Sequence, residues 1–200
     1  EIITEYLVEN SDTVDVFSYQ IPEDYDTLNS HTLLVAFHQW GGDENSNYYT
    51  QFDEEANNRN WVMLSPYGGS VNNYNHQGAQ TFVIQEILWM MDHFNIDSDR
   101  IYIGGVSAGG IITVNAAYLD QDGEIPASLV EYMEENGGLE GSSGNEGYDS
   151  HFHGIINLCG AVGDYNWIVE GDIPIVSIHG DEDTIVPYGD GLITLFGLNM

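Results

Sequence analysis

Short apolar runs alternate with amphipathic stretches along most of the chain. Residues 32–37, 155–159 and 173–178 are compact runs of aliphatic side chains, typical of strands that are buried on both faces. Residues 81–94 carry apolar side chains at helical spacing, which indicates an amphipathic helix. Strands that alternate with helices favour a mostly parallel sheet with helices on both faces.

The same criteria predict the remaining elements. Residues 2–8 and 14–21 indicate a pair of antiparallel entry strands. Further strands are predicted at residues 61–65 and 101–104, further helices at 46–58, 107–119 and 125–135, and polar or glycine-rich loops at 66–80, 95–100 and 136–147. No internal repeat emerges, so residues 1–200 are expected to form a single domain.

Charge excludes several kinds of partner. The chain has 33 acidic residues against two basic ones, Arg59 and Arg100, and its formal net charge is −31. Nucleic acid and anionic lipid carry the same sign, so neither is an expected partner, and no apolar run is long enough to predict a membrane span. Two explanations stay open: a saline medium or bound cations, and selection for the solubility of an extracellular surface. Cys159, the only cysteine, is expected to be a small buried side chain.

Residues 105–109 match the pattern G-x-S-x-G. A predicted strand comes directly before them and a predicted helix directly after, which is the strand–turn–helix setting of the nucleophile elbow in the α/β-hydrolase fold. The flanking glycines allow strand and helix to approach closely, and the serine projects from a strained turn. The pattern therefore predicts Ser107 as a nucleophile; the alternative is a glycine-rich helix start that Ser107 caps.

The nucleophile needs two backbone donors for the oxyanion. In this fold one donor is the N–H of the residue after the nucleophile, here Ala108. The other comes from a loop after an earlier strand, and residues 38–42 fit that loop, with Trp40 as the predicted donor and Gln39 as the alternative. His38 is interpreted as structural, because the order serine, acid, histidine leaves no catalytic role for it.

Residues 178–187 supply the predicted acid. They follow an apolar strand and resemble the H-G-x-x-D-x-x-V-P segment of α/β-hydrolases, in which the aspartate is the acid that orients the histidine. By position this aspartate is Asp183, with Asp181 and Glu182 as alternatives. Three adjacent acids lack the spaced ligands of a calcium loop, so no metal is expected.

The histidine of the triad should follow the acid in the chain, and none does. His179 lies too close to Asp183 to be the usual base, whereas His151 and His153 follow a glycine-rich loop and could approach the site. We expect instead that the base lies beyond Met200, together with the last strand and helix of the fold.

Three blocks carry a resemblance to a known group of enzymes. Residues 35–43, 100–109 and 179–188 are similar, in order and spacing, to the secreted feruloyl esterases and polyhydroxybutyrate depolymerase-like esterases. This resemblance implies an exported serine esterase that needs no cofactor. Its substrates would be small or polymeric neutral esters: phenolic or acetyl esters of the plant cell wall, or a polyester. The oligomeric state is not predicted.

Aromatic residues in the loops after two predicted strands are candidates for substrate contacts, since they could stack on a ring or a sugar. They are Tyr48, Tyr49, Tyr67 and Tyr74. Two other functions stay open. One is a serine peptidase or dienelactone-type hydrolase of the same fold, and the other is a binding or structural protein that kept the fold without the base.

Overall fold

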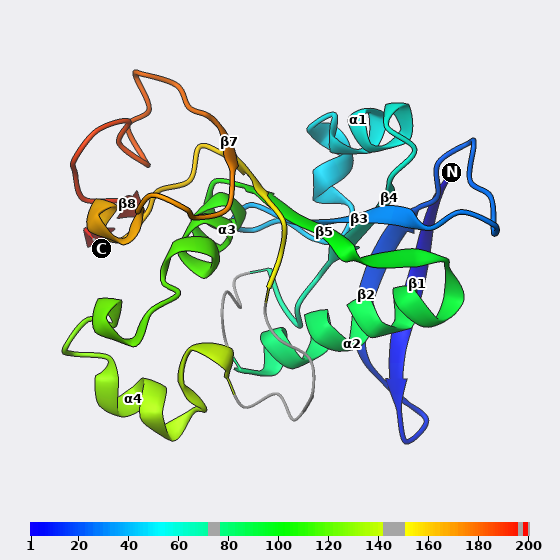
Figure 1. Cartoon of the computed structure of the whole chain (residues 1–200), viewed down its shortest axis with the longest axis horizontal. Helices are drawn as coiled ribbons and strands as arrows, with labels where there is room; N and C mark the ends of the chain where they lie inside the picture. Colours follow the sequence, from blue (N-terminus) through cyan, green and yellow to red (C-terminus); the bar gives the residue numbers. More distant parts are fainter. Residues whose placement is uncertain (72–76, 142–150, 196–197, 200) are drawn as a thin grey trace.

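The computed structural model describes residues 1–71, 77–141, 151–195 and 198–199. Its centre is a seven-stranded sheet in the order β1-β2-β4-β3-β5-β6-β7 (Figure 1). β1 pairs with β2, and β2 with β4, in the antiparallel sense, while the other neighbours are parallel. The strands are β1 (Ile2–Glu9), β2 (Asp12–Gln20), β3 (His31–Phe37), β4 (Val62–Pro66), β5 (Ile96–Val106), β6 (Ile155–Leu158) and β7 (Ile175–Ile178), and a separate ribbon pairs β8 (Thr194–Leu195) with β9 (Leu198–Asn199).

Helices cover both faces of the sheet, as the alternating pattern predicts. The α-helices are α1 (Phe52–Asn58), α2 (Gln77–His93), α3 (Ala108–Tyr118) and α4 (Val130–Glu135), and the 3-10 turns are η1 (Ser46–Tyr49), η2 (Asp122–Glu124), η3 (Gly138–Glu140) and η4 (Tyr165–Trp167). Figure 1 shows α1 and α2 on opposite sides of the sheet. No helix in the described ranges is both long and apolar enough to cross a bilayer.

The central strand β3 divides the core into two layers because successive side chains point to opposite faces. Leu33 and Val35 are fully buried in the larger cluster, where they pack with side chains of α2 and α3. Leu34 and Ala36 belong to a second cluster beneath α1. The prediction that this strand is buried on both faces is therefore confirmed.

Three predicted boundaries differ from those of the structure. The helix predicted at residues 46–58 is divided into η1 and α1, because Gln51 between them adopts φ 69°. The loop predicted at residues 66–80 ends earlier, since α2 already begins at Gln77. The helix predicted at 125–135 is shortened to α4.

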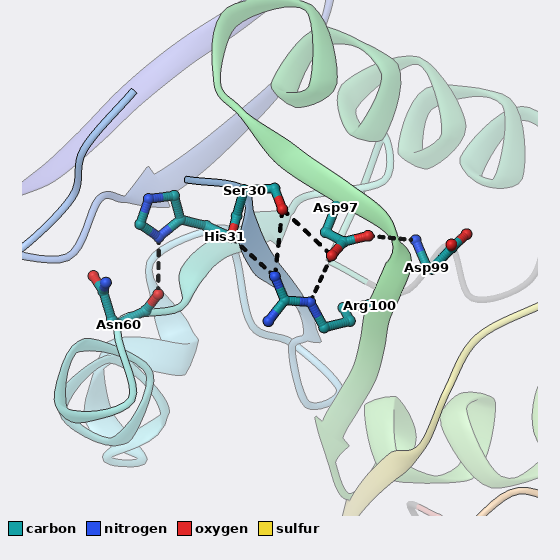
Figure 2. A network of polar contacts seen from close by, with 6 residues as sticks. All are labelled: Ser30, His31, Asn60, Asp97, Asp99 and Arg100. Carbon is teal, nitrogen blue, oxygen red and sulfur yellow. Dashed lines mark hydrogen bonds and ion pairs between the residues drawn. The ribbon is translucent and has the colours of Figure 1, made fainter. Parts of the chain in front are cut away.

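The polar turn predicted at residues 95–100 overlaps the first half of β5, at an irregularity in the pairing with β3, where His31 pairs with Ile96 and Leu33 with Ile101. Arg100 donates from Nε to Asp97 Oδ2 at 2.7 Å and from Nη2 to the carbonyl of Ser30 at 2.9 Å (Figure 2). Asp99 N–H bonds the other oxygen of Asp97 at 3.0 Å. This network ties the start of β5 to the start of β3.

The last strand of the sheet is exposed, so the prediction of a buried strand at residues 173–178 is wrong. Ile175, Val176 and Ile178 are 39%, 60% and 63% exposed, because β7 is the edge strand and pairs only with β6 in the described part of the chain. Cys159 is likewise only half-buried, with φ 57° at the end of β6, so its predicted burial is partial.

Candidate active site

Ser107 lies on the turn between β5 and α3 with φ 54° and ψ −113°. Few residues with a side chain adopt such angles, which cost on the order of 1–3 kcal/mol. The turn is held by the Ser107 N–H, which donates to the carbonyl of Leu158 at 2.7 Å, and by Ile111 N–H, which donates to the carbonyl of Ser107 at 2.8 Å. Ser107 is the N-cap residue of α3, but its side chain makes no capping hydrogen bond. The hydroxyl of Ser107 therefore stands on a strained turn and does not cap the helix that follows.

Gly105 and Gly109 permit this turn because neither has a side chain to block the close approach of backbone. A carbon added to Gly105 would lie 2.3 Å from the carbonyl carbon of Gly109, and one added to Gly109 would lie 2.4 Å from the carbonyl oxygen of Phe37. The first turn of α3 is thus pressed onto β5 and the end of β3. Ala108 is the first residue of α3, so its N–H has no acceptor within the helix. That donor consequently lies beside the loop that follows β3.

His38 fixes the start of this loop. The residue is 5% exposed, its Nδ1 lies 2.8 Å from the carbonyl oxygen of Gln39, and its Nε2 lies 3.2 Å from that of Tyr67. Both ring nitrogens thus face backbone carbonyls. These contacts agree with the structural role predicted for His38.

Backbone bonds fix the rest of the oxyanion loop, residues 38–42. Gly42 N–H donates to the carbonyl of Gln39 at 2.9 Å, and Gly41 N–H donates to that of Val71 at 2.9 Å. Trp40, which is 37% exposed, lies between these anchored positions. The structure thus brings the loop of Trp40 to the helix start of Ala108, and the assignment of their N–H groups as oxyanion donors stays a prediction.

Asp183 is held by the loop that follows β7. Its Oδ1 accepts the N–H groups of Ile185 at 2.8 Å and Val186 at 3.0 Å. These two backbone donors are the main reason why the pKa of Asp183 is lowered, so the carboxyl group is an anion at neutral pH. Asp181 and Glu182 are exposed on the same loop. The fixed geometry favours Asp183 as the acid.

Parallel register brings Ser107 and Asp183 to the same edge of the sheet. Val106 pairs with Leu158, and Leu158 pairs with Ile178, so β5, β6 and β7 end side by side. Adjacent strands are about 4.8 Å apart, which separates the strands that carry the serine and the acid by roughly 10 Å. Active sites of such sheets lie at this carboxyl edge. An imidazole between the two loops would link them.

Three of the described histidines lie at the amino edge of the sheet, away from Ser107. His31 is the first residue of β3, and His151 and His153 come just before β6, where His153 N–H bonds the carbonyl of Ile101 at 2.9 Å. A strand of seven residues spans about 20 Å. The suggestion that His151 or His153 could approach the site is therefore wrong.

His179 lies at the carboxyl edge but is held by its own loop. Its Nε2 is 2.8 Å from the carbonyl oxygen of Val186 and 3.5 Å from Asp183 Oδ2. The ring thus buttresses the acid loop, as expected for a residue too near the acid in sequence to be the usual base. Within the described part of the chain, Asp183 Oδ2 thus has only the 3.5 Å contact with His179, whereas Oδ1 accepts two backbone N–H groups.

The predicted aromatic contacts have different environments. Tyr48 is half-buried: its ring packs against the cluster beneath α1, its hydroxyl lies 3.1 Å from Ser18 Oγ, and burial raises the pKa of Tyr48 to about 12. Its hydroxyl is thus engaged within the fold, and its contact with a substrate stays a prediction. Tyr49 is 90% exposed, and Tyr67 lies beside the oxyanion loop. Tyr74 lies outside the described residues.

Neither of two surface cavities contains a predicted site residue. One, of about 240 Å³, lies at the amino edge and includes both arginines; the other, of about 440 Å³, lies where α3 ends. Within the described ranges, no group of three or more His, Cys, Asp or Glu side chains is arranged to hold a metal ion.

The strand order, the helices on both faces and the strained serine turn define an α/β-hydrolase fold. Similar solved structures support this assignment. Esterase 2 of Thermogutta terrifontis has a TM-score of 0.65 and 16% identity, over 94% of this chain and 74% of that one. FphF, a fluorophosphonate-binding serine hydrolase of Staphylococcus aureus, has a TM-score of 0.53 and 16% identity, over 80% of this chain and 57% of that one. At such identities the likeness concerns the fold alone.

Similarity in sequence is narrower. No family model matches the chain. The bifunctional acetylxylan esterase/xylanase XynS20E of Neocallimastix patriciarum is 33% identical over 90 residues, which make up 42% of this chain. The match spans only 13% of that protein, so its activities do not pass to this chain by similarity.

Proposed function

We propose that this chain is a serine carboxylic-ester hydrolase that acts on neutral esters through an acyl-enzyme. The observation that carries the proposal is the Ser107 turn, with φ 54° and ψ −113°, at the carboxyl end of β5. The strained serine makes no capping hydrogen bond through its side chain, and backbone strain of this kind clusters at active sites. Asp183, fixed two strands away at the same edge, supplies the second group that nucleophilic catalysis requires.

The proposed reaction uses these groups in turn. A histidine removes the Ser107 proton, and the serine oxygen attacks the ester carbonyl. The N–H groups of Ala108 and Trp40 hold the oxyanion, and each such donor is worth about 3–4 kcal/mol in comparable sites. Asp183 orients the histidine and stabilises the imidazolium. Water next cleaves the acyl-enzyme with the same histidine as base.

The histidine is proposed to come from residues after Met200, on a segment that pairs with β7. The exposed edge supports this proposal: Val176 and Ile178 are 60% and 63% exposed, and an open apolar strand edge invites pairing. A strand added there would lead back to the edge that carries Asp183.

The substrates proposed are neutral esters, namely cell-wall phenolic esters, acetyl esters or a polyester. A net charge of −31 repels anionic substrates such as uronates. The local similarity to a protein named as an acetylxylan esterase/xylanase favours acetyl esters among these candidates. The plant cell-wall esters among these candidates lie outside cells, so an extracellular location is part of the proposal.

The test is labelling of the natural full-length protein with a fluorophosphonate ester, followed by intact-mass measurement. Such a reagent modifies a serine that a neighbouring base activates. We expect one adduct, lost in Ser107→Ala and retained in the control Ser128→Ala, whose serine is exposed on a surface turn. Hydrolysis of an acetyl ester should disappear with the adduct.

Other results of this labelling experiment would favour the two alternative functions, a non-catalytic protein or a peptidase. A full-length protein that takes no label and cleaves no ester would be a binding or structural member of the fold. A labelled protein that cleaves a peptide amide faster than the matched ester would be a peptidase.

A further inference from the structure

Two carboxyl groups meet inside the protein between α2 and β2. Glu86 of α2 is 0% exposed and Asp15 of β2 is 5% exposed. Within the described part of the chain, no donor reaches either oxygen of Glu86 or the Oδ2 of Asp15. Buried acids without a partner are costly, so this pair needs a physical explanation.

A shared proton explains the pair. Burial, followed by the neighbouring Asp15, raises the pKa of Glu86 to about 10. Burial also raises the pKa of Asp15, but backbone N–H groups of Val16 and Gly69 oppose that shift. The proton therefore resides on Glu86, whose hydroxyl donates to Asp15, and the two facing acceptors become a donor and an acceptor.

Asp15 uses its other oxygen to hold the segment that follows β4, residues 67–71. Its Oδ1 accepts the N–H of Gly69 at 3.1 Å and that of Val16 at 2.9 Å. Tyr67 N–H adds a bond to the carbonyl of Val16 at 3.3 Å. The segment is thus tied to β2 at both Tyr67 and Gly69.

The same segment holds the oxyanion loop. The carbonyl of Tyr67 lies 3.2 Å from His38 Nε2, and the carbonyl of Val71 accepts the N–H of Gly41 at 2.9 Å. These contacts flank Trp40 on both sides along the chain. With a proton shared between Glu86 and Asp15, polar contacts would run from Glu86 through Asp15 and residues 67–71 to the loop of the predicted donor.

We infer that Asp15 and Glu86 are positioning residues for ester hydrolysis, which hold residues 67–71 against the sheet and thereby set the place of the oxyanion loop. The inference rests on the proposed function, since it assigns that loop its role. An oxyanion donor acts mainly in the transition state, so its displacement lowers kcat and leaves KM nearly unchanged.

The test compares three variants of the natural full-length enzyme at a temperature well below their melting points. Glu86→Leu removes the donor and leaves Asp15 Oδ2 without a partner, so kcat should fall about tenfold or more with KM within about twofold. Glu86→Gln keeps a donor for Asp15, so it should retain kcat within about twofold. Met90→Ala is the matched control, because Met90 is 0% exposed one turn further along α2 and lies in the hydrophobic cluster. It should lose stability but not kcat.

Equal kcat in Glu86→Leu and Met90→Ala would overturn the inference, and so would a kcat in Glu86→Gln as low as in Glu86→Leu. Amide hydrogen exchange of the unsubstituted protein gives a test that needs no variant to fold. The exposed Gly69 and Gly41 should show similar protection, since one segment bonds both, and an unprotected Gly69 beside a protected Gly41 would contradict the coupling. This exchange test stands even if the protein hydrolyses no ester, which would refute the proposed function alone.

Discussion

Replacement of Glu86 by glutamine is expected to stabilise the protein by an amount that grows with pH. The folded protein keeps Glu86 protonated up to a pKa of about 10, whereas the ordinary value is 4.5. Between these values the unfolded chain releases a proton that the folded chain retains. Stability contributed by Glu86 is thus fully present below pH 4.5 and falls as pH rises. Glutamine has no proton to release, so the variant does not share this loss.

The magnitude follows from the shift. Each pH unit between the two pKa values costs about 1.36 kcal/mol, so the interval from the ordinary value of 4.5 to pH 7 costs about 3 kcal/mol. The free energy of unfolding of Glu86→Gln should therefore match that of the unsubstituted protein near pH 4.5 and exceed it by about 3 kcal/mol near pH 7.

The assay is urea denaturation at several pH values between about 4.5 and 8, with salt held constant to screen the net charge. Glu134→Gln, at an exposed position of α4, measures the effect of removing one surface charge. A stability difference for Glu86→Gln that does not change with pH would refute the shared proton. So would stabilisation of the unsubstituted protein by Ca²⁺ that Glu86→Gln lacks, since a cation would then join the two carboxylates.

Four further predictions concern the site and the surface. Gly109→Ala should abolish activity and lower stability by about 1–3 kcal/mol or more, because the added carbon would meet the Phe37 carbonyl oxygen at 2.4 Å; Gly123→Ala, with nothing within 4 Å, is the neutral control in thermal melts and ester assays. Asp183→Asn should lower kcat by roughly 10³–10⁴-fold without loss of folding, because it supplies the wrong partner for the imidazole, and a kinetic effect below tenfold would point to a different acid. Because the pKa of Asp183 is lowered, the order of its loop should be retained at neutral pH and lost only as acid titrates the carboxyl group below the usual aspartate range, which circular dichroism of an acid titration can follow. The melting temperature should rise by several degrees between about 0.1 M and 1 M NaCl, and a flat profile would argue against self-repulsion from the net charge.

Local signals made the nucleophile turn and the central strand predictable. Gly105 is needed because of its contact with Gly109, four residues further on, so the spacing in the sequence carries that part of the geometry, whereas Gly109 is needed because of the distant carbonyl of Phe37. The apolar run of β3 likewise reports burial on both faces. The fixed position of Asp183 is also a local feature, since its backbone partners lie two and three residues further on, while its role as the acid stays a prediction.

Features that depend on distant partners were missed. The first half of β5 has a polar sequence, and it belongs to the strand because Ile96 pairs with His31 of β3, while Arg100 bonds the carbonyl of Ser30, which is 70 residues away. The Asp15–Glu86 pair did leave a signal. Glu86 stands three residues after Val83 and four before Met90, on the apolar face of α2, where a glutamate needs an explanation.

The two edges of the sheet differ in their positive charge. Arg59 and Arg100 both line the cavity at the amino edge, and each is paired with an acid of its own segment. At the carboxyl edge, Asp183 is stabilised by backbone N–H groups instead. Backbone dipoles hold the carboxylate through one oxygen and leave the other to an imidazole, whereas an arginine would bind both oxygens and take the place of the base. The proposed active site therefore needs no arginine to hold Asp183, and both arginines lie at the opposite edge of the sheet.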